Sequence, residues 1–219
     1  MFSLFRRYYE HVTREIFETD LSKKTFAILL ERDGELAGFS SAALYEFSHR
    51  GERLRIVFSG DTVVSRDSWG SQTLARAWIS EMGRISRRFG DARLFWFLIV
   101  KGHRTYRYLP TFAREFVPNW TGRELPYLAA LRNALAADMF GPDFNAETGV
   151  IRFAARRGNL APAWAEPTER ERELPEVAYF LQANPGFRTG DELACLSEVR
   201  ADNMHPIARR WFHAGWAGG

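Results

Sequence analysis

Polar and aromatic side chains follow directly after the most apolar stretch of the chain, residues 94–100. They are Lys101, His103, Arg104, Thr105, Tyr106, Arg107 and Tyr108. An imidazole can take up a proton near neutral pH, a phenol can donate one, and a guanidinium can hold an anion. Ligands of open α/β sheets bind at the carboxyl ends of the strands. We therefore expect a functional site at this edge, with His103 as a candidate base; the alternative is that His103 is a satisfied surface or capping residue.

Asp61 is the only acidic residue within a strand-like segment, residues 53–64. An unpaired buried carboxylate is costly, so Asp61 needs either a partner or a cleft. One hypothesis is that it acts as a general base. The other is that it caps a bulge or pairs with a structural arginine. The preceding Ser59-Gly60 interrupts the strand pattern and predicts a bulge or a close approach by another group.

The positive charge is carried almost entirely by arginine, with 27 Arg and 3 Lys against 27 acidic residues, a net charge of +3. Arginine binds phosphates and stacks on aromatic rings. These arginines are spread over predicted helix faces and turns, which favours a compositional origin. Residues 207–216 mix arginine with aromatic side chains, as proteins that bind single-stranded nucleic acid do. One such cluster in a chain without wider basicity is a weak signal, so nucleic-acid binding is not expected. A docking tail is the preferred interpretation of that segment.

Several classes of protein are excluded by what the sequence lacks. The single cysteine, Cys195, rules out a disulfide framework and a thiol-rich zinc site, and it is expected to be buried in a strand. The scattered histidines predict no metal site. The longest apolar run, residues 94–100, is far shorter than the roughly 20 residues of a membrane-spanning helix. With no signal-peptide pattern, a cytoplasmic protein is expected.

The spacing of apolar residues predicts an α+β fold. Residues 2–16 predict an amphipathic opening helix. Antiparallel strands are expected over 25–31, 36–47 and 53–64, with turns at Asp33-Gly34 and at 49–51. A helix over 71–89 and a strand over 93–100 then predict a right-handed parallel crossover. The later elements are expected to be helices at 103–116 (kinked near Pro110), 124–140 and 175–183, strands at 149–154 and 192–199, and a charged loop at 162–175. We expect one domain over residues 1–219, with a single central mixed sheet flanked by helices.

This order of elements resembles the GNAT-type acyltransferase superfamily. In that superfamily the fourth strand ends in a loop whose backbone amides hold the pyrophosphate of a pantetheine-linked donor at the start of the next helix. The family pattern is a strand ending in Val, a short spacer, Arg-Gly-x-Gly and an apolar helix. Val64, Gly70 and Leu74 match it, within residues 63–74. The resemblance covers residues 1–116; residues 117–219 are expected to add helices, a charged loop and late strands.

The resemblance implies transfer of an acyl group from an acyl-CoA or acyl-carrier-protein thioester to a small-molecule amine. It places a carboxylate base on the fourth strand, which is Asp61 here. It also places a tyrosine that protonates the departing thiolate on the helix after the fifth strand. That position holds Thr111, so Tyr106 and Tyr108 are the candidates on the same helix. The residues expected to hold the donor are Val63, Val64, Trp69, Gly70, Ser71, Gln72, Thr73 and Arg104.

Two departures from the family pattern lie in the donor loop. Trp69 stands where the family has Arg, and Gln72 stands where it has the second Gly. The first removes a charge-assisted donor, and the second adds a side chain where the backbone should approach the pyrophosphate. The acyl-homoserine-lactone-synthase-like branch, which includes long-chain N-acyltransferases, would tolerate such drift because carrier-protein contacts share the binding. The alternative is a non-catalytic GNAT-fold protein that binds a ligand or a partner.

Overall fold

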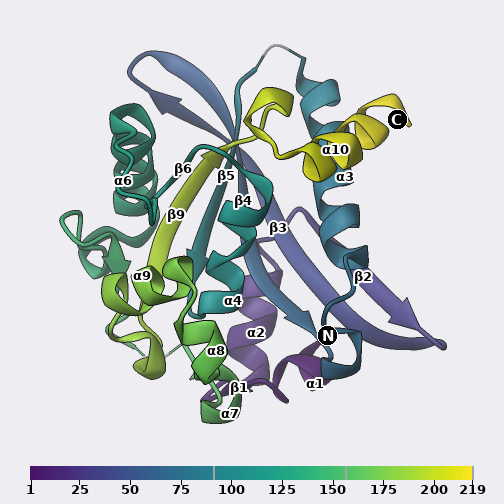
Figure 1. Ribbon diagram of the computed structural model, residues 1–219, viewed down its shortest axis with the longest axis vertical. Coiled ribbons are helices and arrows are strands. Elements are labelled where there is room, and N and C mark those ends of the chain that lie inside the picture. The colour runs from purple at the N-terminus through teal and green to yellow at the C-terminus, as the bar shows by residue number, and fades with distance from the viewer. Residues whose placement is uncertain (91, 156, 219) are drawn as a thin grey trace.

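One mixed β-sheet runs through the molecule, described by a computed structural model over residues 1–90, 92–155 and 157–218 (Figure 1). Its strand order is β2-β3-β4-β5-β9-β6, and the short β7 also pairs with β9. The strands are β2 (Phe26–Arg32), β3 (Glu35–His49), β4 (Glu52–Val64), β5 (Leu94–Val100), β6 (Phe116–Val117), β7 (Val150–Ile151) and β9 (Glu192–Glu198). The expected α+β class with a single central mixed sheet is confirmed.

The centre of the sheet is built as the sequence predicts. β2, β3 and β4 form an antiparallel meander, and its turns place Asp33, Gly34, Arg50 and Gly51 at positive φ. Helix α3 (Thr73–Phe89) then carries the chain to β5, which pairs with β4 in parallel. Gly90 ends α3 with φ +59°. β9 continues the sheet antiparallel to β5, and Cys195 is fully buried in it.

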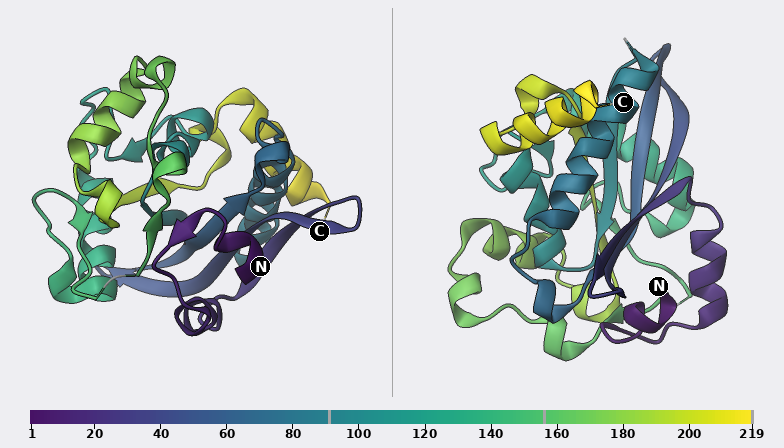
Figure 2. Two further views of the ribbon diagram at one scale, coloured as in Figure 1. Left: turned by 90° about the horizontal axis from the view of Figure 1, so that it is seen from below. Right: turned by 90° about the vertical axis from the view of Figure 1, so that its right-hand side faces the viewer.

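Helices cover both faces of the sheet (Figure 2). On one face lie α3 and α10 (Pro206–Ala217), together with α4 (His103–Tyr106), α5 (Tyr108–Phe112) and α9 (Pro175–Ala183). On the other face lie α2 (Arg14–Leu21) and α6 (Pro126–Phe140). Alternate residues of a strand point to opposite faces, so β5 gives Trp96 and Leu98 to the first face and Phe95 and Phe97 to the second.

Helix α3 is held against the sheet by α10, the two helices touching through their backbones. A side chain at Gly83 of α3 would collide with the Phe212 carbonyl oxygen of α10. A side chain at Gly215 of α10 would collide with the Ser80 carbonyl oxygen of α3. The segment read as a docking tail is therefore a helix of the core, with Trp211 and Phe212 buried.

Three expected elements differ from the structure. The opening helix is divided into α1 (Phe2–Phe5), β1 (Tyr9–Glu10) and α2, because His11 has φ +56° and Thr13 caps a new helix by accepting from the Ile16 N–H. The helix expected at 103–116 ends at Phe112 and is interrupted at Arg107, near Pro110, which has no N–H to donate to the Tyr106 carbonyl. The charged loop contains α7 (Pro162–Ala165) and α8 (Glu169–Arg172), preceded by β8 (Asn159–Leu160), which pairs with β1.

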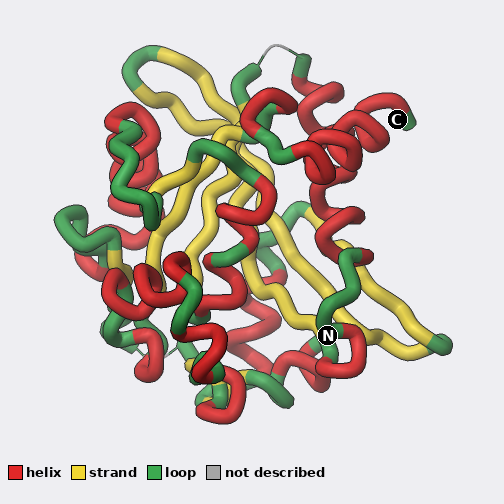
Figure 3. Tube along the Cα trace, in the orientation of Figure 1, coloured by secondary structure: helices red, strands yellow, loops and turns green. Residues whose placement is uncertain are grey.

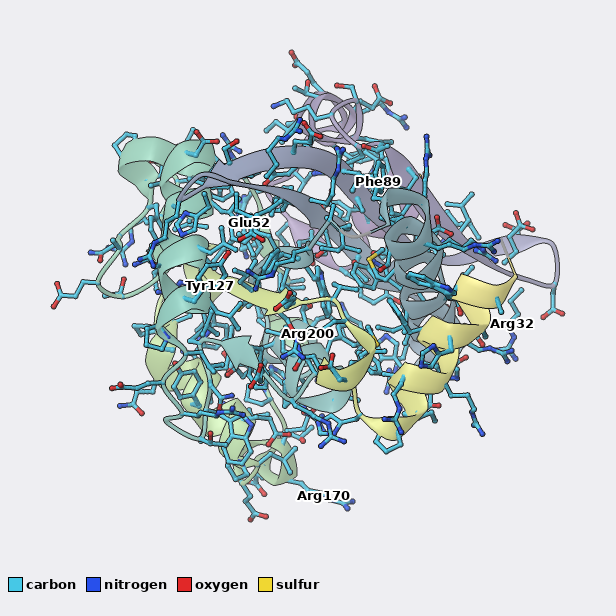
Figure 4. The ribbon with its side chains drawn as sticks, turned by 90° about the horizontal axis from the view of Figure 1, so that it is seen from above. Arg32, Glu52, Phe89, Tyr127, Arg170 and Arg200 are labelled. Carbon is cyan, nitrogen blue, oxygen red and sulfur yellow. The ribbon has the colours of Figure 1, made fainter. Side chains whose placement is uncertain are left out.

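Many arginines are used in ion pairs at the amino end of β4 and β5. Arg93 donates to both carboxylate oxygens of Glu198, at 2.8 and 3.0 Å, and Arg200 contacts Glu115 at 2.7 Å. Figure 4 looks onto this end, where the labelled Glu52, Tyr127 and Arg200 come from different elements. Over the described residues, no helix is both long enough and apolar enough to cross a bilayer.

Candidate functional site

β4 and β5 part before either strand ends, and this leaves a gap in the sheet. Their parallel pairing stops at Ser59 and Leu98, although β4 continues to Val64. At the same point the β3–β4 register shifts, so Gly60 and Asp61 are in register with no residue of β3 or β5. This is the irregularity that the Ser59-Gly60 sequence predicts. The strands of the sheet spread apart toward this end (Figure 3).

An apolar groove opens from the gap on the face covered by α3. β4 contributes Ser59, Gly60 and Thr62 to its wall, and β5 contributes Trp96, Leu98 and Ile99. The other walls come from Ser40 of β3, from Leu74, Ala75, Trp78 and Ile79 of α3, and from Thr105, Tyr108 and Phe112 of α4 and α5. The groove holds about 500 Å³ of unfilled space, including the part open to solvent.

The start of α3 stands at the mouth of this groove with free backbone donors. Gly70 has φ +81°, which turns the chain from the short helix Arg66–Ser68 into α3. Within the described residues, the N–H groups of Gly70, Gln72, Leu74 and Ala75 donate no hydrogen bond. Free N–H groups at the start of a 17-residue helix favour an anion. The residues expected at the donor loop therefore do form a helix N-terminus beside a groove.

Two tryptophans cover one side of the donor loop. Trp69 is 40% exposed, donates through Nε1 to the Val64 carbonyl at 2.8 Å, and meets the Trp164 ring edge-on at 5.4 Å. Arg104 lies over the Trp69 ring at 5.0 Å and donates to the Trp164 carbonyl at 2.7 Å and to Glu171 at 3.3 Å. The guanidinium of Arg104 thus stands next to the loop where Trp69 replaces the arginine of the family pattern.

On the opposite face of the sheet, the gap is lined by charged side chains. We call the set formed by Tyr9, Asp20, Lys24, Asp61, Lys101 and Glu192 the charged cluster. Ser59 and Thr62, on either side of the bulge, line the groove, whereas Val63, the residue after Thr62, packs against α1 and α2 on the other face. Because side chains alternate along a strand, Asp61, the residue before Thr62, also belongs to this other face. A side chain at Gly60 would collide with the end of Lys24 and with Ser41. Only the backbone of Gly60 therefore separates the groove from the charged cluster.

Within the charged cluster, Asp61 has no ion-pair partner among the described residues. Lys24, whose side chain is 4% exposed, pairs with Asp20 at 2.8 Å, and Lys101 pairs with Glu192 at 3.2 Å. Burial and, less strongly, the negative charge of Asp20 raise the pKa of Asp61 to about 6, although Lys101 and Lys24 act in the opposite direction. Burial likewise raises the pKa of Glu192 and of Tyr9. A carboxylate with a pKa near neutrality can take up a proton from a bound amine.

The candidate proton donors occupy very different places. Tyr108 lines the groove, stacks on Phe112 at 5.8 Å, and has its pKa raised by burial. Tyr106 is fully buried, donates its hydroxyl to the Pro118 carbonyl at 2.9 Å, and stacks on Tyr179. Its hydroxyl thus has a partner away from the groove. Of the two tyrosines, Tyr108 is the one that lines the groove.

His103 is buried behind the groove wall rather than exposed in it. Neither ring nitrogen makes a hydrogen bond to a described residue, although Nε2 lies 3.5 Å from a carboxylate oxygen of Glu171. Burial, and next the positive charge of Arg104, lower the pKa of His103. Both effects favour the neutral form of the imidazole. The described residues contain no group of three or more His, Cys, Asp or Glu side chains placed to hold a metal ion.

The remaining donor-loop residues flank the groove without entering it. Val63 is buried against the α1–α2 cluster, and Ser71 and Thr73 share a hydrogen bond between their hydroxyls at 2.8 Å. Lys24 and Glu192 were not predicted from the sequence as site residues. Glu192 is the first residue of β9, and Lys101 directly follows β5, so charged residues at the ends of apolar strands were the available signal. The antiparallel β5–β9 pairing that joins them could not be read from spacing.

Comparisons with known proteins do not assign the chain to a family. No protein-family model matches the chain, and no curated protein matches it. Among solved structures, it is similar to a protein of Enterococcus faecalis V583 described as a conserved protein of unknown function and probable N-acyltransferase. That likeness has a TM-score of 0.36 and 19% identity, and covers 47% of this chain and 25% of the other. Similarity at this level leaves the activity to be argued from the residues of the site.

Proposed function

We propose that the protein is an acyltransferase that moves an acyl group from an acyl-CoA or acyl-carrier-protein thioester to an amine. The observation that carries this proposal is the gap between β4 and β5. It has an apolar groove with free helix N–H groups on one face and a charged cluster containing an unpaired carboxylate on the other. A thioester donor needs the first environment and an amine acceptor needs the second.

The donor is assigned to the α3 face. The free N–H groups of Gly70, Gln72, Leu74 and Ala75 would receive the phosphates of the donor, with Arg104 adding positive charge beside Trp69. The uncharged groove between β4, β5 and α3 would take the pantetheine arm and bring the thioester to Gly60. Val64 and Trp69 shape the loop through their hydrogen bond, and Ser71 and Thr73 hold the first turn of α3.

The acceptor is assigned to the face of the charged cluster. An ammonium group next to Asp61 transfers a proton to the carboxylate, either directly or through water. The free amine then attacks the thioester carbonyl carbon: the N–C bond forms and the C–S bond breaks. The hydroxyl of Tyr108 on the groove side gives its proton to the departing thiolate, and the second proton, which the nitrogen loses as the amide forms, restores this hydroxyl through water. The acyl group thus passes through the gap, and no group besides the donor and the amine is consumed.

A second candidate function is a non-catalytic protein that binds a ligand or partner at the same gap. The observation that favours it is the packing of Trp69 on Trp164, which covers one side of the loop. This alternative assigns no proton transfer to Asp61 or Tyr108.

Binding and turnover measured together separate the two functions. Thermal-shift and mass-spectrometric screens against acetyl-CoA, longer acyl-CoAs and acyl carrier protein, with a panel of amines, test for donor binding and for amide product. The acyltransferase proposal predicts release of free thiol and formation of an amide, both lost in Asp61→Asn and reduced in Tyr108→Phe. Binding without turnover supports the second function. Absence of binding by every pantetheine donor contradicts both the donor assignment and the proposed reaction.

A further inference from the structure

A second cavity, itself partly open to solvent, adjoins the groove on the same face of the sheet. It is lined by Met82, Ala113, Val199 and Met204, among others, and holds about 300 Å³ of unfilled space, including the part open to solvent. Because Trp96 is in register with Ser197 of β9, this cavity lies farther along β5 than the gap, toward the amino end of the strand. The two cavities share four wall residues: Trp78, Ile79, Trp96 and Phe112.

Two indoles in contact belong to this shared wall. The rings of Trp78 on α3 and Trp96 on β5 lie 4.4 Å apart between centroids and are inclined by 39°. Trp96 also donates its Nε1–H to the Ser59 hydroxyl at 2.9 Å, directly at the residue where β4 and β5 part. The Trp96 ring is therefore held by Trp78 on one side and by this hydrogen bond at its edge.

The chemistry on the two sides of this wall matches an aliphatic chain. The uncharged side chains of Leu98, Ile79 and Phe112 line the groove, and the second cavity is lined by methionine and valine side chains together with Ser197 and Glu198. A methionine wall adapts to chains of different shape. The acyl group is the part of the proposed donor that such a surface would bind.

We infer that the Trp78–Trp96 pair is the stop that limits the length of the acyl group. Short acyl chains end against the two indoles, and longer chains need the space of the second cavity, which the indoles close off. The inference rests on the proposed function, and names the residues that select its donor: Trp78 and Trp96 are specificity-determining residues and take no part in proton transfer.

The experiment is a chain-length series on matched variants. Calorimetric dissociation constants are measured for acetyl-, butanoyl-, hexanoyl-, octanoyl- and decanoyl-CoA and for the corresponding S-acyl-pantetheines. The proteins are the unaltered chain, Trp96→Leu and Trp78→Leu. Phe97→Leu is the control, because Phe97 is the adjacent β5 residue, is also buried, and faces α6 on the opposite side of the sheet. Ile79→Ala, a smaller change in the same wall, is the fallback if a tryptophan variant fails to fold.

For the unaltered chain, affinity is expected to rise with each added methylene and then to fall once the chain reaches the indoles. One buried methylene corresponds to about a fourfold gain in affinity. Trp96→Leu and Trp78→Leu should move the optimum to longer chains, with a gain of about tenfold or more for decanoyl-CoA. Ile79→Ala should give a smaller shift in the same direction. Phe97→Leu should leave the optimum unchanged.

The possible failures are distinct. If thioesters bind but the optimum stays in place in both tryptophan variants and in Ile79→Ala, or if Phe97→Leu moves it equally, the chain-length inference is wrong while the proposed function stands. If neither the CoA esters nor the pantetheine esters bind to any folded variant, the proposed function fails, and the inference with it.

Discussion

The two faces of the sheet differ most where β4 and β5 part. On the α3 face, the gap opens into a groove walled by tryptophan, leucine, isoleucine and phenylalanine side chains, with small hydroxyl groups from β3 and β4. On the α2 face, the same few residues of β4 are next to two lysines and three carboxylates. Gly60 carries no side chain, and the end of Lys24 and the Ser41 hydroxyl lie against its backbone instead. One local irregularity of the sheet thus creates two contrasting environments that meet at a single residue.

This contrast explains how one chain could hold both partners of an acyl transfer. An apolar groove stabilises a pantetheine arm and excludes water, whereas charged groups bind and deprotonate an ammonium ion. Burial makes Asp61 a stronger base than an exposed aspartate, because the carboxylate loses solvation and Asp20 repels its charge. Substitutions can therefore be made on one face of the gap at a time.

The largest effect is expected from Asp61→Asn on the charged face. Removing the general base should lower kcat/KM about 10²–10⁴-fold while leaving donor affinity nearly unchanged. Steady-state kinetics and calorimetric binding of acetyl-CoA measure the two quantities. Asp20→Asn is the matched control in the same cluster. An equal loss of activity in both variants would show that the cluster acts as a whole and that Asp61 has no special role.

The pH dependence of the rate tests the same role of Asp61 as the general base. Asp61 is competent only when ionised, so activity should rise as the pH passes about 6, the raised pKa of this carboxyl. Asp20→Asn removes a negative charge that raises this pKa, so its rising limb should move to lower pH. Rate profiles of the two proteins between pH 4 and pH 8 provide the test. A limb that stays in place would exclude Asp61 as the titrating group.

On the groove face, Ala75→Phe should block the donor. Ala75 lines the groove and its N–H is one of the free donors of α3, so a large side chain there would fill the space needed by the pantetheine arm. We expect acyl-CoA affinity to fall at least about tenfold, the loss from filling a well-formed pocket. Arg76→Phe, the same new side chain at the exposed neighbouring position, is the control. Equal affinities in the two variants would place the donor elsewhere.

The smallest effect concerns stability, and its sign follows from the raised pKa of Asp61. The folded protein binds this proton more tightly than the unfolded chain, so the contribution of Asp61 is least unfavourable at low pH and becomes destabilising as pH rises through about 6. Asp61→Asn should therefore be more stable than the unaltered protein by about 1–3 kcal/mol at pH 8, and the difference should vanish near pH 4. Denaturant unfolding at the two pH values measures this difference, and destabilisation by Asp61→Asn at pH 8 would contradict the account.

The sequence was most informative where local patterns decide the structure. The alternation in 53–64, the long stripe of α3 and the turn at Asp33-Gly34 are local signals, and the elements they predict are present. The Ser59-Gly60 interruption located the bulge beside which the site lies. The N-terminal segment was predicted as one helix because its apolar spacing is helical, but the positive φ of His11 and the pairing of β1 with β8 override that spacing.

The charged cluster could not be predicted because its members come together only through tertiary contacts. Asp61 was found as an isolated acid in a strand, whereas Lys24, Lys101 and Glu192 reach it from the segment between α2 and β2, from the residue after β5 and from the start of β9. Tyr106 and Tyr108 were both candidates in the sequence, with Tyr106 preferred. Because they are two residues apart on a helical segment, they point to different sides, and the packing of α4 and α5 places Tyr106 in the core and Tyr108 in the groove wall. The spacing alone does not tell which of the two sides meets the groove.

The central claim is that the groove and the start of α3 hold a thioester donor. Amide hydrogen exchange with and without an unreactive thioether analogue of acetyl-CoA tests it most directly, because exchange reports single backbone N–H groups. The account predicts slower exchange at Gly70, Gln72, Leu74 and Ala75 when the analogue is bound, and no change in α6 on the opposite face. Binding of the analogue with unchanged exchange at these four amides, or with protection confined to α6, would contradict it.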